Sequence, residues 1–227
     1  EGGGVWSRSQ KSVPVSPQAR AALGIEAQTM TPNELIHAIL QAPVDLLYHG
    51  GIGTYNKASR EPHADVGDRA NDAIRIDGRQ LRCKVVCEGG NLGATQRGRI
   101  EAARHRVSLN SDAIDNSAGV DTSDHEVNIK ILLGLAIADG EMTEKQRNTL
   151  LAQMTDDVAA LVLRDNTFQT QCLSITHRLG PQLIDQEARF IRFLEKAGRL
   201  NRTTEFLPSA DEITERKAAG QGLTTPE

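Results

Sequence analysis

Three short stretches rich in glycine and asparagine contain the residues whose types and spacing could bind a ligand. They are Gly50-Gly51-Ile52-Gly53, Glu88-Gly89-Gly90-Asn91 and Asn116-Ser117-Ala118-Gly119. Glycine lets the backbone approach a ligand closely, and an asparagine amide offers both a donor and an acceptor, as a carboxamide ligand requires. Any one of these stretches could be an ordinary turn, because glycine and asparagine dominate turns.

Each stretch follows a short apolar segment that we predict to be a β-strand. The segments are Val44–Tyr48, Lys84–Cys87 and a shorter piece around Ala113–Ile114. A helix is predicted from about Thr95 to His105, and strands that alternate with helices indicate a parallel sheet. Since ligands bind at the carboxyl ends of parallel strands, three such loops at one edge favour a binding site over three separate turns.

Capping patterns locate the other predicted helices. A serine or threonine three residues before glutamate or glutamine predicts a helix N-terminus, and this pattern occurs at Thr31, Ser123, Thr143 and Ser209. Apolar residues at helical spacing follow over 150–162 and 183–194.

Two regions lack such patterns. The N-terminal residues up to Leu23 have no clear period, so we predict loop with at most short elements. Residues 56–80 are polar and charged, and we predict a long loop with one helix over Val66–Ile74.

These elements predict an α/β fold. Residues 1–140 would form the C-terminal half of a Rossmann-like parallel-sheet nucleotide domain, and residues 141–227 an all-helical C-terminal region. No G-x-G-x-x-G occurs between a strand and a helix, and Gly51-Ile52-Gly53 lacks the G-K-[ST] of a phosphate loop. The half that binds the pyrophosphate is therefore expected elsewhere.

Composition and charge argue against several classes of protein. A net charge of -4 does not favour nucleic acid or an anionic membrane as partner. No apolar run approaches the roughly 20 residues that span a bilayer, and no signal peptide is visible. The three cysteines, Cys83, Cys87 and Cys172, predict reduced thiols and a cytoplasmic location. Because the sequence starts with Glu1, it is also consistent with a piece of a longer reading frame.

Several charged or polar side chains have two interpretations. Ser123 could simply cap a helix, or its hydroxyl and the nearby N–H groups could hold a carboxylate. No metal is expected, because the acidic cluster with His125 lacks a recognisable ligand spacing. Four basic residues could meet phosphate or carboxylate, although surface solvation is the default: Lys57, Arg69, Arg97 and Arg99.

Taken together, the loops resemble the large bacterial NAD-specific glutamate dehydrogenases. The resemblance rests on VDLLYHGGIGTYNKAS, HADVGDRANDAIR, RCKVVCEGGNLGATQRGRIE and DAIDNSAGVDTSDHEVNIKILL, and it extends weakly to AAGQGLTTPE. The smaller glutamate dehydrogenases have an E-G-A-N turn similar to Glu88–Asn91, and an N-A-G-G-V-T-V-S segment similar to Asn116–Ser123. Ala118 replaces a glycine of that segment, and the loop over residues 56–80 has no counterpart in the smaller enzymes.

The resemblance implies roles for single residues. Asn91 would contact the ribose side of NAD, Asn116 the nicotinamide side, and Ser123 a carboxylate of glutamate. Gly50 and Gly51 would follow the strand beneath the cofactor. Glu88, Gly89 and Gly90 complete the predicted set of cofactor-binding residues.

The reaction implied is oxidative deamination of L-glutamate to 2-oxoglutarate and ammonia. No residue here matches the family's catalytic lysine and aspartate, which lie in an upstream part of the same enzyme, so no catalytic residue is predicted. We also expect a homo-oligomer. Two alternatives use the same loops without catalysis: a module that binds a nucleotide or small anion, and an inactive fragment.

Overall fold

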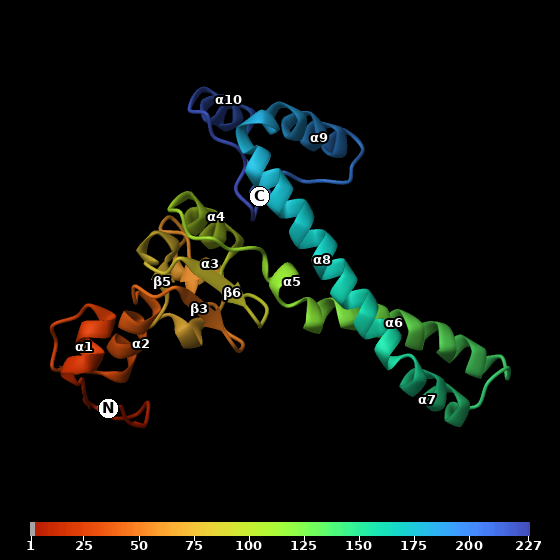
Figure 1. Ribbon diagram of the computed structural model, residues 1–227, viewed down its shortest axis with the longest axis horizontal. Coiled ribbons are helices and arrows are strands. Elements are labelled where there is room, and N and C mark those ends of the chain that lie inside the picture. Colours follow the sequence, from red (N-terminus) through yellow and green to blue (C-terminus); the bar gives the residue numbers. More distant parts are fainter. Residues whose placement is uncertain (1–2) are drawn as a thin grey trace. The chain divides into compact units, whose positions relative to one another are not determined.

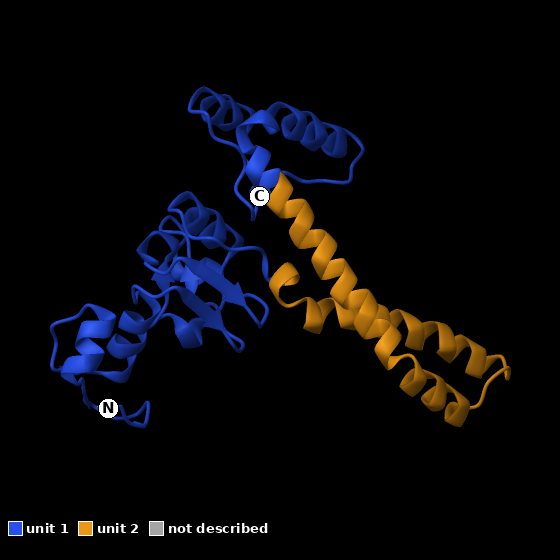
Figure 2. Ribbon diagram, in the orientation of Figure 1, with its two compact units in different colours: residues 1–112, 176–227 blue, residues 113–175 orange. Residues whose placement is uncertain are grey.

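The computed structural model describes residues 3–227, and the elements run in the order drawn in Figure 1. The chain divides into two compact units (Figure 2). Unit 1 is the chain up to Asp112 together with Thr176–Glu227, and unit 2 is Ala113–Ile175. Strands and helices alternate in the first part of unit 1, whereas unit 2 is helical, so the chain is of mixed α/β class.

A parallel pair of strands lies in unit 1. β3 (Leu46–His49) pairs with β6 (Val85–Glu88), and His49 lies opposite Glu88. Both strands therefore end at the same level. This pairing confirms the strands predicted before the first two glycine-rich stretches. Ser108 also pairs in parallel with β6, since the Val86 N–H donates to the Ser108 carbonyl at 3.0 Å.

The third predicted strand is wrong. Ala113 and Ile114 lie in a short helix, α5 (Asp112–Asp115). The residue that pairs with β6 in addition to β3 is Ser108. An apolar dipeptide is too short for its period to distinguish a strand from a helix. The third stretch rich in asparagine and glycine consequently begins a long helix, α6 (Ser117–Ala138), and does not end a strand.

The segment between the two strands is more structured than predicted. β4 (Asn56–Lys57) pairs in parallel with β5 (Ile76–Asp77), and η2 (Gly78–Gln80) follows. The helix predicted over Val66–Ile74 is wrong. A short helix, α3 (His63–Val66), ends where that helix was expected to begin, because Gly67 adopts a left-handed φ of 77°.

Polar contacts replace the expected helix. After α3 the chain makes a single 3₁₀ turn, η1 (Arg69–Asn71), and reaches the buried Arg75. The guanidinium of Arg75 donates to the Thr54 carbonyl at 2.8 Å and pairs with Asp72 at 2.5 Å. A charged side chain thus organises a segment that has few apolar residues, which explains why hydrophobic spacing did not reveal it.

Two predicted helices of unit 1 begin at threonine caps, of which the one at Thr31 was predicted. α2 (Pro32–Leu40) starts with a capping box, in which the Thr31 N–H donates to Glu34 at 2.8 Å and the Glu34 N–H donates to the Thr31 hydroxyl at 3.3 Å. α4 (Gln96–Arg104) starts after Thr95, whose hydroxyl accepts from the Gly98 N–H at 2.9 Å. Both helices confirm the sequence prediction.

The N-terminal stretch also contains short elements. β1 (Val13–Pro14) pairs antiparallel with β2 (Thr29–Met30), and α1 (Pro17–Leu23) lies between them. A hydrophobic core joins α2, the strands and α4. Its buried members are Leu40, Ile76, Leu81, Cys83, Val86, Ala102, Val107 and Leu109. This core fixes the level at which β3 and β6 end.

The remaining part of unit 1 is helical. It contains η3 (Gly180–Gln182), α9 (Ile184–Lys196) and α10 (Ala210–Ala218). Ser209 forms the predicted capping box with Glu212, and Ile184, Ala188 and Ile213 make a small buried cluster.

Unit 2 consists of α6, α7 (Glu144–Gln153) and most of α8 (Thr155–Leu179). Thr143 caps α7 as predicted, and its hydroxyl accepts from the Gln146 N–H at 3.3 Å. The apolar stripe over 150–162 is divided between α7 and α8, because Met154 ends the first of them. The predicted domain boundary near residue 140 falls within unit 2, and it stays a prediction.

Two findings concern the class of protein. Within residues 3–227, Cys83, Cys87 and Cys172 form no disulfide. Among the helices of residues 3–227, none is both long and apolar enough to cross a membrane.

Candidate functional site

Two glycine-rich loops meet where β3 and β6 end. The N–H groups of Gly89 and Gly90 donate to the His49 carbonyl, at 3.0 and 3.2 Å. A Cβ atom added to Gly90 would lie 2.9 Å from the carbonyl oxygen of Gly51. Since side chains do not tolerate that distance from a rigid backbone, the close approach of the loops requires glycine at position 90. The sequence prediction that Gly50, Gly51, Gly89 and Gly90 share one edge is thus consistent with the geometry.

A buried ion pair lies at the end of β6, beside the place where the two glycine loops meet. This place is called the glycine corner, and it comprises Gly50, Gly51, Glu88, Gly89, Gly90 and Asn91. Glu88 is 1% exposed and Arg99 4% exposed. The guanidinium of Arg99 donates to both carboxylate oxygens of Glu88, at 2.6 and 2.9 Å. The Ala94 N–H donates to the same carboxylate at 3.0 Å. Glu88 therefore binds the segment that follows its own glycine loop.

Asp112 extends the ion pair. Its carboxylate lies 3.2 Å from the guanidinium of Arg99 and accepts from the Leu92 N–H at 2.8 Å. Burial alone would lower the pKa of Arg99, but the hydrogen bonds and charges of Glu88 and Asp112 raise it above its ordinary value. Arg99 is therefore a permanent cation that holds two carboxylates beside the loop.

The loop closes through a backbone conformation that is uncommon for its residue type. Leu92, which follows Asn91, has a left-handed φ of 62° and is exposed. Its carbonyl accepts from the Thr54 hydroxyl at 2.7 Å. Positive φ is unfavourable for a branched side chain and concentrates at functional sites, where surrounding contacts hold it. These contacts present Asn91 on the exposed side of the loop.

The imidazole ring of His49 is buried and makes no hydrogen bond within residues 3–227. The residue is 4% exposed, and neither ring nitrogen has a hydrogen-bond partner among residues 3–227. Burial, and to a smaller extent the charge of Arg99, lowers the pKa of His49 from 6.5 to about 4. The ring is therefore neutral at physiological pH, and His49 is part of the buried interior next to the glycine loops.

The third motif lies in unit 2 and starts α6. Asn116 occupies the N-cap position, and its side chain fills the space beside Gly119, where an added Cβ would lie 2.5 Å from the Asn116 amide oxygen. Asn166 on α8 fixes this turn, because its amide donates to the Ile114 carbonyl at 3.1 Å and to the Ser117 hydroxyl at 3.0 Å.

Ser123 does not cap a helix, so the prediction of a helix start at this residue is wrong. α6 already begins at Ser117, and Ser123 is an exposed residue within it. A helix leaves only its first four N–H groups without helical partners, so the anion site that these groups could form belongs to the turn near Asn116. Only the hydroxyl of Ser123 remains available for a ligand.

Two of the four basic candidate residues are exposed to solvent, as is usual for such side chains. Arg69 and Arg97 are exposed. Lys57 and Arg99 are buried, and Lys57 pairs with Asp77 at 2.6 Å. No local pattern indicated roles for Asp112 or Asn166, because each acts through a residue far away in the chain.

The predicted cofactor residues of unit 1 therefore converge on one corner, comprising Gly50, Gly51, Glu88, Gly89, Gly90 and Asn91. Asn116 and Ser123 belong to unit 2. An α/β corner of this kind, with glycine loops at the carboxyl ends of parallel strands, is typical of proteins that bind small ligands there.

Comparison with known proteins identifies the family. A model of the bacterial NAD-glutamate dehydrogenase catalytic domain matches residues 1–176. The NAD-specific glutamate dehydrogenase of Pseudomonas aeruginosa is 57% identical over 226 residues, and that of Halomonas elongata is 56% identical over 227 residues. The Mycobacterium tuberculosis protein of the same name is 51% identical over 233 residues. The chain therefore belongs to the bacterial NAD-glutamate dehydrogenase family.

The matches cover the whole of this chain but only part of each relative. In all three cases the alignment includes 100% of the chain and 14% of the relative. The resemblance noted in the sequence is thus confirmed, and the chain spans only a small share of the length of these relatives.

Proposed function

We propose that this chain is part of an NAD-dependent glutamate dehydrogenase and supplies the nicotinamide side of its cofactor site. The observation that carries the proposal is the contact between two glycine loops at the carboxyl ends of β3 and β6. Ligands of parallel α/β sheets bind at that edge. The names of the relatives support NAD as cofactor. The strand pair would be the C-terminal half of a Rossmann-like sheet whose other half lies elsewhere in the enzyme.

Within this proposal the residues of the corner have different roles. Gly50, Gly51 and Asn91 are exposed and would contact the cofactor directly. Gly90 allows the two loops to touch, as its distance to Gly51 requires. Glu88 is buried and bound to Arg99, so it positions the loop.

The residues proposed to lie next to the substrate belong to unit 2. Asn116 would face the nicotinamide, and the hydroxyl of Ser123 would donate to a carboxylate of L-glutamate. Asn91 and Asn116 would hold NAD, which when bound would supply the hydride acceptor for the oxidative deamination of L-glutamate to 2-oxoglutarate and ammonia. We assign this chain binding and orientation of the reactants, and no proton transfer. The rest of the polypeptide, a homo-oligomeric assembly and a cytoplasmic location remain parts of the proposal.

The cofactor role is tested by Gly51→Ala in the full-length enzyme. A Cβ at this position would meet no atom within 4 Å, and Gly51 has no left-handed φ. The fold should therefore be unchanged, while a methyl group would crowd any ligand on the backbone. We expect the Michaelis constant for NAD to rise and that for glutamate to stay constant. An unchanged constant for NAD would contradict a cofactor site at this loop.

The carboxylate role is tested by Ser123→Ala. The Michaelis constant for glutamate should rise well above any change for NAD. Ser174→Ala is the matched control, because Ser174 is also exposed in unit 2 and its hydroxyl donates to the Thr170 carbonyl at 2.7 Å. Equal glutamate kinetics of the two variants would remove Ser123 from the substrate site. NAD binding without any glutamate turnover by the full-length protein would replace the proposal with a non-catalytic binding module.

A further inference from the structure

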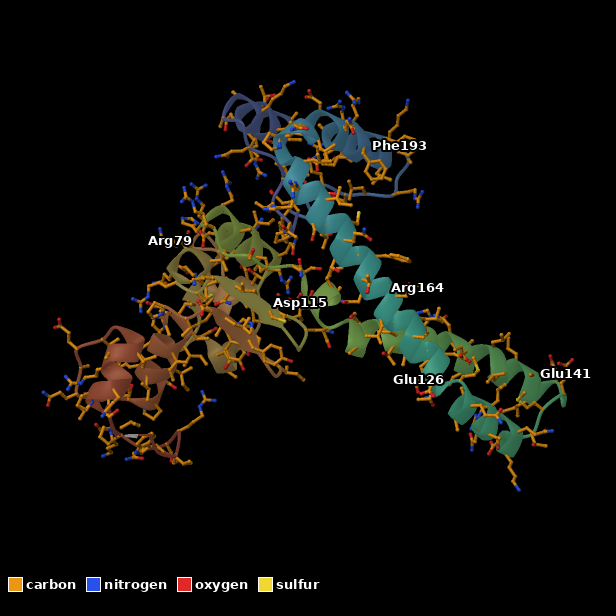
Figure 3. All side chains as sticks on the ribbon, viewed as in Figure 1. Arg79, Asp115, Glu126, Glu141, Arg164 and Phe193 are labelled. Carbon is orange, nitrogen blue, oxygen red and sulfur yellow. The ribbon has the colours of Figure 1, made fainter. Side chains whose placement is uncertain are left out.

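Three potential metal ligands meet between two helices of unit 2. Asp121 and His125 are one helical turn apart on α6, and Asp165 projects from α8. One ligand atom from each residue lies within 4.8 Å of the other two. The Nε2 atom of His125 is 3.7 Å from Oδ1 of Asp121 and 3.5 Å from Oδ2 of Asp165. Figure 3 labels the sequence neighbours Glu126 and Arg164, which locate this level on the two helices.

Two atoms of this cluster are hidden from solvent and lack hydrogen bonds. Oδ2 of Asp121 and Nε2 of His125 are buried atoms without a hydrogen-bond partner among residues 3–227. A buried polar atom that lacks a partner destabilises the folded state, because it has lost its hydrogen bonds to water. Oδ1 of Asp165 is 3.4 Å from the Arg164 guanidinium, which leaves Oδ2 facing the histidine. Something that accepts electron pairs from all three groups would relieve this cost.

We propose that Asp121, His125 and Asp165 bind a divalent transition-metal ion. One imidazole and two carboxylates suit ions such as Zn²⁺, Co²⁺ or Mn²⁺, and the two carboxylate charges balance the charge of the ion. Ligand atoms held tetrahedrally at about 2.0–2.1 Å from zinc lie roughly 3.3 Å from one another. The observed separations of 3.5 and 3.7 Å are therefore within a small side-chain movement of a coordinated geometry.

The three side chains are 20%, 29% and 30% exposed, so water can complete the coordination. Three protein ligands and an open position are typical of metal sites at which a further ligand exchanges, whereas structural zinc sites are closed by four protein ligands. The same contacts could instead be an ion pair between a protonated His125 and the two carboxylates. That alternative needs no metal, so binding measurements distinguish the two.

The experiment uses the full-length enzyme after treatment with a chelator, and each variant is compared with the unchanged enzyme. Co²⁺ is titrated with visible absorption as the readout, and Mn²⁺ with electron paramagnetic resonance. Asp165→Asn and His125→Gln each remove one ligand. Asp124→Asn is the matched control, because Asp124 is an exposed carboxylate on the same helix and outside the cluster. Cys172→Ser controls for binding by the exposed thiol on α8. Circular dichroism verifies that each variant keeps its helices.

We expect one ion per chain at this cluster, which the ligand variants should bind more weakly. Asp165→Asn and His125→Gln should each weaken binding by roughly tenfold or more, since changes even in the groups around metal ligands cost about 10–100-fold. Asp124→Asn and Cys172→Ser should bind as the unchanged chain does. Absence of saturable binding would overturn the proposal, as would equal affinity of the folded His125→Gln variant or loss of binding in Cys172→Ser. Neither result bears on the cofactor role of the glycine loops in unit 1.

Discussion

The glycine corner of unit 1 and the helices of unit 2 hold their functional residues by different means. In unit 1, Glu88, Arg99 and His49 are each at most 4% exposed, and the unit contains a hydrophobic core of eight buried residues. In unit 2, where all residues are described, only Ser117 and Val162 are buried. Large apolar side chains of its helices are exposed instead, among them Val127, Ile131, Leu132, Leu135, Leu163 and Phe168.

The two regions therefore differ in the contacts that hold their loops in position. The loops at Gly51 and Gly90 are fixed by strands, a core and a buried ion pair within the same unit. The motif at Asn116 is fixed by a few polar contacts to α8, chiefly those of Asn166. Loss of a buried contact should therefore destabilise unit 1 as a whole, whereas changes in unit 2 should act locally.

The largest effect is expected for Arg99→Ala. It would leave the carboxylate of Glu88 buried and without its cation, which typically costs about 3–5 kcal/mol. Hydrogen exchange of the amides of β3 and β6 should accelerate together, and the thermal unfolding temperature should fall. Lys84→Ala is the control, since it breaks a 2.6 Å ion pair whose side chains are 80% and 86% exposed. If both variants behaved alike, the buried ion pair would not support the corner.

The next effect concerns pH and His49. Its pKa is 6.5 in the unfolded chain and about 4 in the folded one. Between these values the unfolded state binds more protons, so stability falls as the pH is lowered from 6.5 to 4, by about 3 kcal/mol in total. His49→Gln cannot ionise and should lose this part of the pH dependence. Equal slopes of unfolding free energy against pH for the two proteins would show that His49 does not titrate in this way.

The sequence predicted those features of the corner that obey local rules. Strand ends followed by glycine, and the cap at Thr31, follow from residue types within a few positions of each other. Burial of Arg99 was not predicted, because its partner Glu88 is 11 residues away and only the folded chain brings them together. For the same reason the position of Asp165 beside His125 could not be seen in the sequence.

The errors in unit 2 have a different origin. Ser123 and Glu126 have capping-box spacing, but this spacing also occurs by chance inside a helix, and the preceding residues from Ser117 onward already continue α6. Ala113 and Ile114 were assigned to a strand because they are apolar, although two residues define no period. Local patterns thus detect the presence of a helix more securely than its first residue.

Gly90→Ala should have an intermediate effect. Its Cβ would lie 2.9 Å from the Gly51 carbonyl oxygen and 3.1 Å from the carbonyl carbon. Because backbone must move to relieve this contact, we expect a loss of about 1–3 kcal/mol, the usual cost of overpacking. Gly51→Ala is the matched control with open space around the new methyl group. Urea unfolding of both variants measures the difference, and equal stability would mean that the loops do not touch in solution.

The smallest effect compares the same capping chemistry in the two units. Thr31→Ala in unit 1 and Thr143→Ala in unit 2 each remove a capping box, at a cost of about 1 kcal/mol. α2 contributes Leu40 to the hydrophobic core, whereas α7 has no buried residue. We therefore expect Thr31→Ala to accelerate hydrogen exchange in β6 as well as in α2, because their unfolding is coupled through the core. Thr143→Ala should accelerate exchange in the first turns of α7 alone. Exchange that spread from Thr143 along α6 and α8 would show that unit 2 unfolds as cooperatively as unit 1, and the contrast between the two units would then be lost.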